Sequence, residues 1–133
     1  MKKIALYLIL IISTFAFAQK KSAKEQKGKT EKYTLYKTHV HASYYNDKFN
    51  GKRTASGRKF NNNKFTAAHK KFAFGTKLKI TNERNKKSVI VEVTDRGPFS
   101  KRREIDLTKR AFMKIASNKG SGSLKVKIEV LKN

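Results

Sequence analysis

The sequence feature that most limits the fold is a period-two alternation of apolar and polar residues in short segments. Residues 76–81 and 125–131 alternate in this way, and residues 88–94 are rich in β-branched side chains. A segment of this kind has one apolar and one polar face, which is typical of a half-buried β-strand. Residues 82–87 are polar and separate the first two segments, so residues 76–94 predict a hairpin. Residues 38–45 and 64–68 are shorter strand candidates.

One helix is expected after residue 107. Thr108 is a candidate N-cap, and Ala111, Phe112, Ile115 and Ala116 fall on one helical face. Several short strands with one small helix indicate an all-β fold, a compact β-barrel. A chain of 133 residues has room for one such domain.

The N-terminus has the pattern of a secretory signal peptide, which we place at residues 1–18. Two lysines precede an almost wholly apolar run, which ends at the cleavage-type triplet Ala16-Phe17-Ala18. The alternative is an uncleaved anchor, but the run is short against the roughly 20 residues that span a bilayer. We therefore expect export to the periplasm or cell envelope, with no stable membrane anchor after cleavage.

The chain is strongly basic, with 33 Lys and Arg against nine Asp and Glu, a formal net charge of +24. Loss of residues 1–18 removes two lysines and no acid, which leaves +22. This charge favours an anionic partner, and export argues against nucleic acid and for a polymer of the envelope. Residues 19–37 are lysine-rich without apolar periodicity, which predicts a disordered basic arm, either an electrostatic tether or a solubilising linker. The folded domain is then expected at residues 38–133.

The composition also excludes several kinds of chemistry. The chain has no cysteine, which rules out disulfides, thiolate zinc sites and a cysteine nucleophile. It has three histidines, of which His39 and His41 share a strand face without an evident third ligand. We therefore expect neither a metal site nor a cofactor.

Two carboxyl groups are the candidates for acid–base catalysis. The folded part holds seven: Asp47, Glu83, Glu92, Asp95, Glu104, Asp106 and Glu129. Five are expected in turns, on polar strand faces or, for Glu104, solvated among basic residues. Asp95 continues the valine face of its strand, and Asp106 lies between Ile105 and Leu107. Apolar neighbours favour a protonated carboxyl, as in a general acid, whereas nearby arginines and a helix dipole oppose it. The alternatives are a turn-forming role for Asp95 and a helix cap for Asp106.

Several other side chains could contact a substrate. His69, at the end of a strand, is a candidate proton relay or sugar-contacting donor, or else a buried histidine with its hydrogen bonds satisfied. Tyr44, Tyr45, Phe49 and Phe60 could stack on sugars, or could belong to the core.

A set of short fragments in fixed order gives the chain a family resemblance. They are Ala42-Ser43-Tyr44-Tyr45, Phe49-Asn50-Gly51, Thr54-Ala55-Ser56-Gly57, Thr66-Ala67-Ala68-His69, Phe74-Gly75-Thr76, Thr94-Asp95-Arg96-Gly97-Pro98-Phe99 and Ile105-Asp106-Leu107. Over about residues 38–131 the chain resembles the RlpA-like domain, a six-stranded double-psi β-barrel similar to those of expansins and certain endoglucanases. The family includes septal-ring lytic transglycosylases that cleave peptidoglycan glycan strands.

The resemblance implies catalytic roles for His69, Asp95 and Asp106. We assign substrate binding to four further positions: Tyr44, Tyr45, Thr66 and Arg96. The family usually has Glu directly after the Thr-Ala-Ser-Gly fragment, where this chain has Arg58.

A lytic transglycosylase needs fewer carboxyl groups than a hydrolase, because its nucleophile is a hydroxyl of the substrate itself. We therefore expect a secreted, monomeric enzyme that cleaves peptidoglycan strands and leaves 1,6-anhydro-muramic ends. The alternative, favoured by Arg58, is a non-catalytic, expansin-like barrel that binds peptidoglycan.

Overall fold

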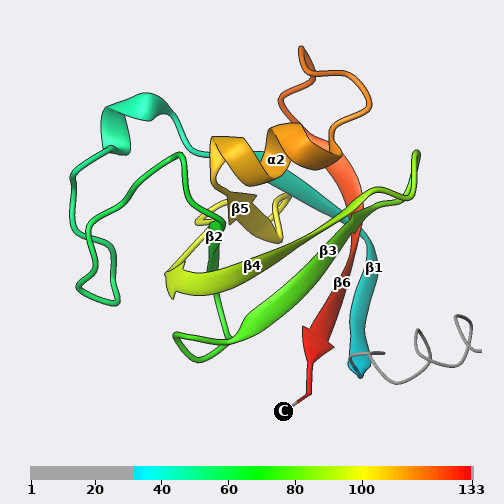
Figure 1. Ribbon diagram of the computed structural model, residues 1–133, viewed down its shortest axis with the longest axis horizontal. Coiled ribbons are helices and arrows are strands. Elements are labelled where there is room, and N and C mark those ends of the chain that lie inside the picture. The colour runs from blue at the N-terminus through cyan, green and yellow to red at the C-terminus, as the bar shows by residue number, and fades with distance from the viewer. Residues whose placement is uncertain (1–31, 133) are drawn as a thin grey trace, which may run out of the picture. The chain divides into compact units, whose positions relative to one another are not determined.

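The computed structural model describes residues 32–132 and shows a closed barrel of six strands (Figure 1). The elements are β1 (Tyr33–Tyr44), the 3₁₀-helix η2 (Asp47–Phe49), β2 (Thr66–His69), β3 (Lys77–Asn82), β4 (Ser88–Asp95), β5 (Ile105–Leu107), α2 (Lys109–Ile115) and β6 (Leu124–Leu131).

The strands follow the order β1-β5-β2-β4-β3-β6 around the barrel. Two neighbouring pairs, β1 with β5 and β2 with β4, are parallel, and the other pairs are antiparallel. Closure pairs the edges of the sheet that would otherwise be open to other chains. The predicted all-β, six-stranded barrel with one short helix is confirmed.

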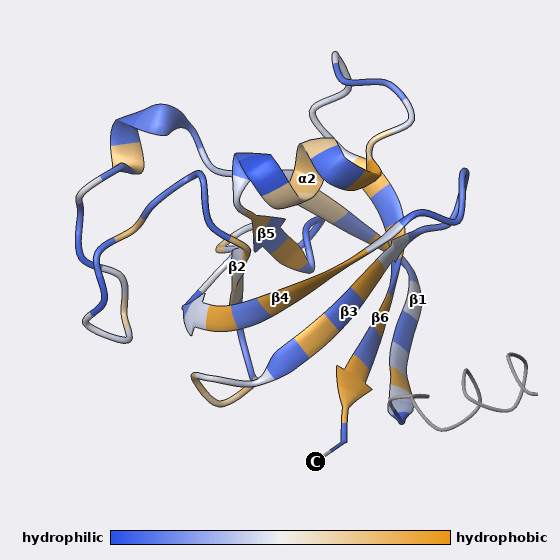
Figure 2. Cartoon of the chain, in the orientation of Figure 1, coloured by the Kyte–Doolittle hydropathy of each residue, from blue (hydrophilic) through white to orange (hydrophobic). Residues whose placement is uncertain are grey.

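The barrel interior is filled by the apolar faces of the predicted strands. Alternate residues of β3, β4 and β6 are buried, and β3 shows the same alternation in its bands of hydropathy (Figure 2). Helix α2 adds Ala111, Phe112 and Ile115 to this core. Each fully buried aliphatic or aromatic side chain of this kind contributes about 1.5–3 kcal/mol.

Thr108 is the N-cap of α2, as the sequence predicts. Its hydroxyl accepts a hydrogen bond from the Ala111 amide and donates one to the Lys64 carbonyl oxygen at 2.5 Å. The side chain is fully buried. Thr108 therefore starts the helix and also fixes it to the segment that leads into β2.

Strand β1 begins earlier than the sequence pattern indicates. Tyr33 and Leu35, expected in the basic arm, pair with Leu131 and Glu129 of β6. Register shifts between Leu35 and Lys37 and between Lys37 and Val40 interrupt the alternation, which hides this half of the strand from a period-two search. The expected signal peptide and residues 19–31 of the arm lie outside the described residues. Among residues 32–132, no helix is long and apolar enough to cross a membrane.

Candidate functional site

The candidate site is a row of residues that crosses four strands on the outside of the barrel. Ser43 of β1 lies opposite Asp106 of β5, which lies opposite Ala68 of β2, and Ala68 lies opposite Asp95 of β4. Residues directly opposite one another in a sheet share a face. Ile105 and Leu107, on either side of Asp106, point into the core, so the row itself faces outward.

A β-bulge brings Asp95 into this row. Ala67 pairs with Val93, but the next residue of β2, Ala68, pairs with Asp95, so β4 has one extra residue at Thr94. Such an insertion changes the face to which the following side chain points. The prediction that Asp95 continues the buried valine face is therefore wrong: the carboxyl group is half-buried and hydrogen-bonded outside the core.

Three donors converge on the carboxyl group of Asp95. Oδ1 accepts hydrogen bonds from the backbone amides of Ala55 and Arg96, each at 2.9 Å, and Oδ2 accepts one from the Tyr45 hydroxyl at 2.7 Å. The bond to Arg96 reaches the amide of the next residue, whereas an Asx turn uses the amide two residues on. The bond to Ala55 ties the Thr-Ala-Ser-Gly fragment to the end of β4, which holds both the fragment and the carboxyl group in place.

The Tyr45 hydroxyl contacts one of the two candidate carboxyl groups, that of Asp95. Burial, the hydrogen bond to Asp95 and the charges of Asp95 and Asp106 all raise the pKa of Tyr45, so the phenol keeps its proton and acts as a donor. Its ring is stacked on Phe60 with ring centroids 4.4 Å apart, and meets the edge of Phe49 at 5.7 Å. Tyr45 therefore takes part in the site through its hydroxyl.

Asp106 is held less completely than Asp95. Its Oδ1 accepts a hydrogen bond from the Ser43 hydroxyl at 2.5 Å and lies 3.5 Å from Nε of Arg103. Within residues 32–132, no hydrogen bond is made to its Oδ2. Asp106 is not the helix cap, because Thr108 has that role.

The two carboxyl groups flank one small residue. Asp95 and Asp106 are both register partners of Ala68, on opposite sides of β2. Neighbouring strands lie about 4.8 Å apart, so the two backbone positions are separated by roughly 10 Å. Ala68 is the one residue of the row between them, and it is itself buried.

His69 is close in sequence to this row but faces away from it. Its ring is buried against Tyr36 and Phe72, and its register partner in β5 is the core residue Ile105. Nδ1 accepts a hydrogen bond from the Lys71 amide at 3.1 Å, so the proton of the neutral ring is on Nε2, 3.0 Å from Glu104 Oε1. Burial is the main cause that lowers the pKa of His69, which favours this neutral form.

Glu104 is not solvated as expected. Its side chain is 16% exposed and lies between His69 and Lys37, whose Nζ is 3.3 Å away. The structure thus puts the predicted His69 in a separate buried network.

The other predicted substrate-binding residues have varied surroundings. Tyr44 packs on Phe112 in the core, with ring centroids 4.6 Å apart. The Arg96 guanidinium donates to the carbonyl oxygens of His69 and Phe72, so it fastens the loop after β2. Ser43 and Arg103 were missed by sequence reasoning, because only the strand register shows that they adjoin Asp106.

Two hollows flank the segment that leads into β2, and Asn61 lines both. One, of about 580 Å³, is lined by Asp47, Asn50, Asn61, Asn62, Asn63, Lys109, Arg110 and Met113. The other, of about 410 Å³, is lined by Arg53, Thr54, Gly57, Arg58, Lys59, Phe60, Asn61, Lys64, Thr66 and Thr94. We call the second one the basic hollow. Among residues 32–132, no three side chains of the metal-binding types form a group that could hold an ion.

Comparison with known proteins identifies relatives over the barrel. A family model described as "Lytic transglycolase" matches residues 37–128. A protein named endolytic peptidoglycan transglycosylase RlpA from Rickettsia felis is 47% identical over 113 residues, which cover 80% of this chain and 49% of that protein. One of the same name from Pasteurella multocida is 47% identical over 90 residues, with 68% and 30% covered. The chain thus spans half or less of the length of these relatives.

Solved structures support the fold alone. An expansin of Clavibacter michiganensis, in complex with cellohexaose, superposes with a TM-score of 0.58 at 19% identity, over 71% of this chain and 50% of that one. A Streptomyces papain inhibitor superposes with a TM-score of 0.57 at 19% identity, over 74% and 97%. One barrel is evidently compatible with different activities. From the family model and the curated relatives, the chain belongs to the lytic transglycolase family of RlpA-like double-psi β-barrels.

Proposed function

We propose that the chain is an exported lytic transglycosylase that cleaves the glycan strands of peptidoglycan. The observation that carries the proposal is the outward-facing row in which Asp95 and Asp106 flank Ala68, with the Tyr45 hydroxyl bound to Asp95. The names of the relatives support the same reaction and substrate. The amide side chains that line the larger hollow are suited to hydrogen-bonding sugar hydroxyls.

The reaction needs one proton donor, one proton acceptor and no water. The bond between C1 of a muramic acid and the bridging oxygen breaks, and the C6 hydroxyl of the same sugar forms a new bond to C1. The bridging oxygen gains a proton, and the C6 oxygen loses one. Because the nucleophile belongs to the substrate, positioning supplies much of the rate.

The hydrogen bonds suggest how the two carboxyl groups divide these tasks. Asp106 has an oxygen without a protein partner among the described residues, so it is the group we assign to protonate the bridging oxygen. Asp95 accepts three hydrogen bonds, an arrangement suited to an acceptor, and we assign it the C6 hydroxyl proton. Exchange with water then restores both groups. His69 enters the proposal as a positioning residue, acting through Glu104 and Lys71 on the ends of β2 and β5.

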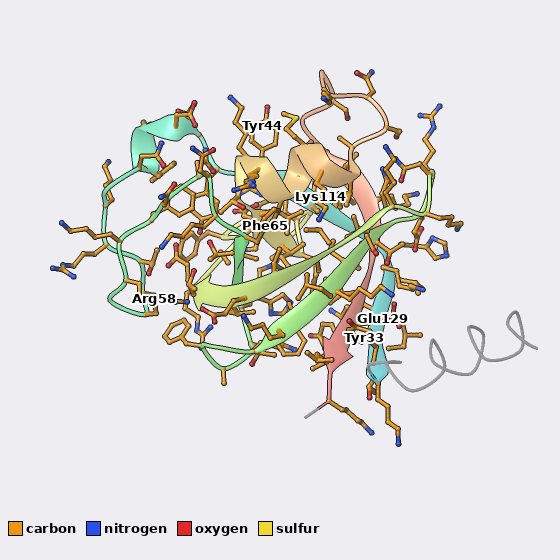
Figure 3. The ribbon with its side chains drawn as sticks, in the orientation of Figure 1. Tyr33, Tyr44, Arg58, Phe65, Lys114 and Glu129 are labelled. Carbon is orange, nitrogen blue, oxygen red and sulfur yellow. The ribbon has the colours of Figure 1, made fainter. Side chains whose placement is uncertain are left out.

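One observation favours the second candidate, a barrel that binds peptidoglycan without cleaving it. Arg58, labelled in Figure 3, occupies the position where the resemblance leads one to expect Glu. It forms an ion pair with Glu92. The site thus lacks one acid, and the basic hollow gains a cation.

Product analysis separates the two candidates. The full chain is incubated with purified, peptide-free glycan strands, and the products are identified by mass spectrometry. The enzyme proposal expects anhydro-muramic ends from the native chain and their loss in both Asp95→Asn and Asp106→Asn. Binding to the strands without products at any pH would support the second candidate. Products that persist in both variants would overturn the assignment of the site.

Export to the envelope belongs to the same proposal. Its support is the signal-peptide pattern of residues 1–18 and an envelope polymer as substrate. Fractionation of cells that express the full chain, with N-terminal sequencing of the product, tests for cleavage after Ala18.

A further inference from the structure

The basic hollow concentrates positive charge on one side of the candidate site. No carboxylate among the described residues lines it, and four of its lining residues are cationic: Arg53, Arg58, Lys59 and Lys64. Glu92 forms an ion pair with Arg58, and its carboxylate is shared between Arg58 and Lys77. In a concave site, charge of one sign raises the local concentration of the opposite ion.

The backbone that carries these side chains is fixed. The Arg58 carbonyl oxygen accepts hydrogen bonds from both the amide and the hydroxyl of Thr54, at 2.8 and 2.7 Å. The Arg53 guanidinium donates to the Gly57 carbonyl oxygen at 2.9 Å, and Arg53 also pairs with Lys59 in a β-bridge. Gly57 has a φ of 91°, a conformation that favours glycine. The two arginines therefore start from a preorganised loop, which lowers the entropic cost of binding.

The same loop connects the basic hollow to the carboxyl pair. Thr54 and Gly57 line the hollow, and the residue after Thr54, Ala55, donates its amide proton to Asp95. Thr94 also lines the hollow and directly precedes Asp95 in β4. A strand that lies along this loop would meet the cations and the candidate catalytic groups within neighbouring sugar units.

We propose that the basic hollow is an anion subsite that takes a carboxylate carried by the glycan strand. Arg58 and Arg53 supply planar guanidinium groups that pair with carboxylates, Thr66 and Thr94 supply hydroxyls, and Phe60 supplies apolar surface. The identity of the strand rests on the proposed function. The carboxylate has two sources, the lactyl group of a muramic acid without peptide and the acidic residues of a stem peptide.

Binding assays with the full chain carrying Asp95→Asn test this proposal without turnover. Three probes are compared: peptide-free glycan strands, strands with their stem peptides, and neutral chitin oligomers. The test variant adds Arg58→Gln and Lys64→Gln. The control variant adds Lys125→Gln, a change of an exposed lysine on β6 outside the hollow. Thermal melts verify that all variants are folded.

The proposal expects the test variant to bind an anionic strand at least about tenfold more weakly, with a shallower salt dependence. Chitin binding and the control variant should be unchanged. Loss confined to peptide-free strands identifies the lactyl carboxylate, and loss confined to peptide-bearing strands identifies the peptide. Equal losses for neutral and anionic probes, or no loss for either anionic strand, would overturn the subsite. Because binding is measured in an inactive variant, a native chain that cleaves nothing contradicts the proposed function alone.

Discussion

Replacement of Tyr45 by Phe should weaken both the fold and the site, by removal of a single hydrogen bond. The hydroxyl donates to Asp95 Oδ2 at 2.7 Å, whereas the stacking of the ring on Phe60 does not depend on the hydroxyl. A hydrogen bond to a charged group contributes about 1.5–3 kcal/mol. Asp95 is half-buried, so water can replace part of the lost bond. We therefore expect a loss of about 1 kcal/mol, which lowers the melting temperature of a domain of this size by about 4–8 °C.

The same substitution should also reduce turnover, because Oδ2 of Asp95 loses the hydrogen bond that orients it. A loss of about 1.4 kcal/mol in the transition state corresponds to a tenfold lower kcat. Tyr44→Phe is the matched control, since the Tyr44 ring packs on Phe112 and no hydrogen bond of its hydroxyl is present among the described residues. Thermal melts and product formation are measured for both variants. Equal effects of the two substitutions, or no effect of Tyr45→Phe, would refute this account of the hydroxyl.

Four further predictions concern the carboxyl group, the buried histidine, the helix cap and the core. Asp106→Asn can keep its hydrogen bond to Ser43, so the unfolding midpoint should change little. Product formation should fall at least about 100-fold, because the amide cannot donate the proton. Unfolding of the variant that accounts for its inactivity would count against a chemical role. Burial lowers the pKa of His69, so the unfolded chain binds this proton more readily. The contribution of His69 to the free energy of unfolding should therefore be constant above about pH 6.5 and fall as the pH drops from there toward the folded-state pKa of His69. Urea unfolding across this range should show the fall in the native chain and a smaller one in His69→Gln. Thr108→Ala should cost about 1–2 kcal/mol in urea unfolding, because it removes the cap and the bond to Lys64, whereas Thr108→Ser should cost less. Phe112→Ala should cost about 3–5 kcal/mol in the same measurement, and a cost below 1 kcal/mol would contradict its place in the core.

The parts of the fold that the sequence predicts are those governed by local periodicity. The alternation in β3, β4 and β6 reflects one buried face, and Thr108 caps α2 through a contact three residues away. Strand β5, Ile105–Leu107, has only three residues, too few to show a period. Its place in the barrel is decided by pairing with β1 and β2, which are distant in sequence.

The site depends on register more than on local pattern. The residue types Asp95 and Asp106 are visible in the sequence, but the bulge at Thr94 that puts them on one face is a property of the pairing between β2 and β4. The contact between His69 and Glu104 joins residues 35 positions apart. A local reading therefore takes Glu104 as solvated, because its sequence neighbours are basic.

The most direct test of the central claim follows the oxygen atoms of the reaction. The native full chain is incubated with peptide-free glycan strands in water enriched in heavy oxygen, and the new strand ends are analysed by mass spectrometry. An intramolecular attack by the C6 hydroxyl predicts anhydro ends that contain no solvent oxygen. Ends that carry one solvent oxygen would show hydrolysis instead, and would contradict the proposed reaction at Asp95 and Asp106.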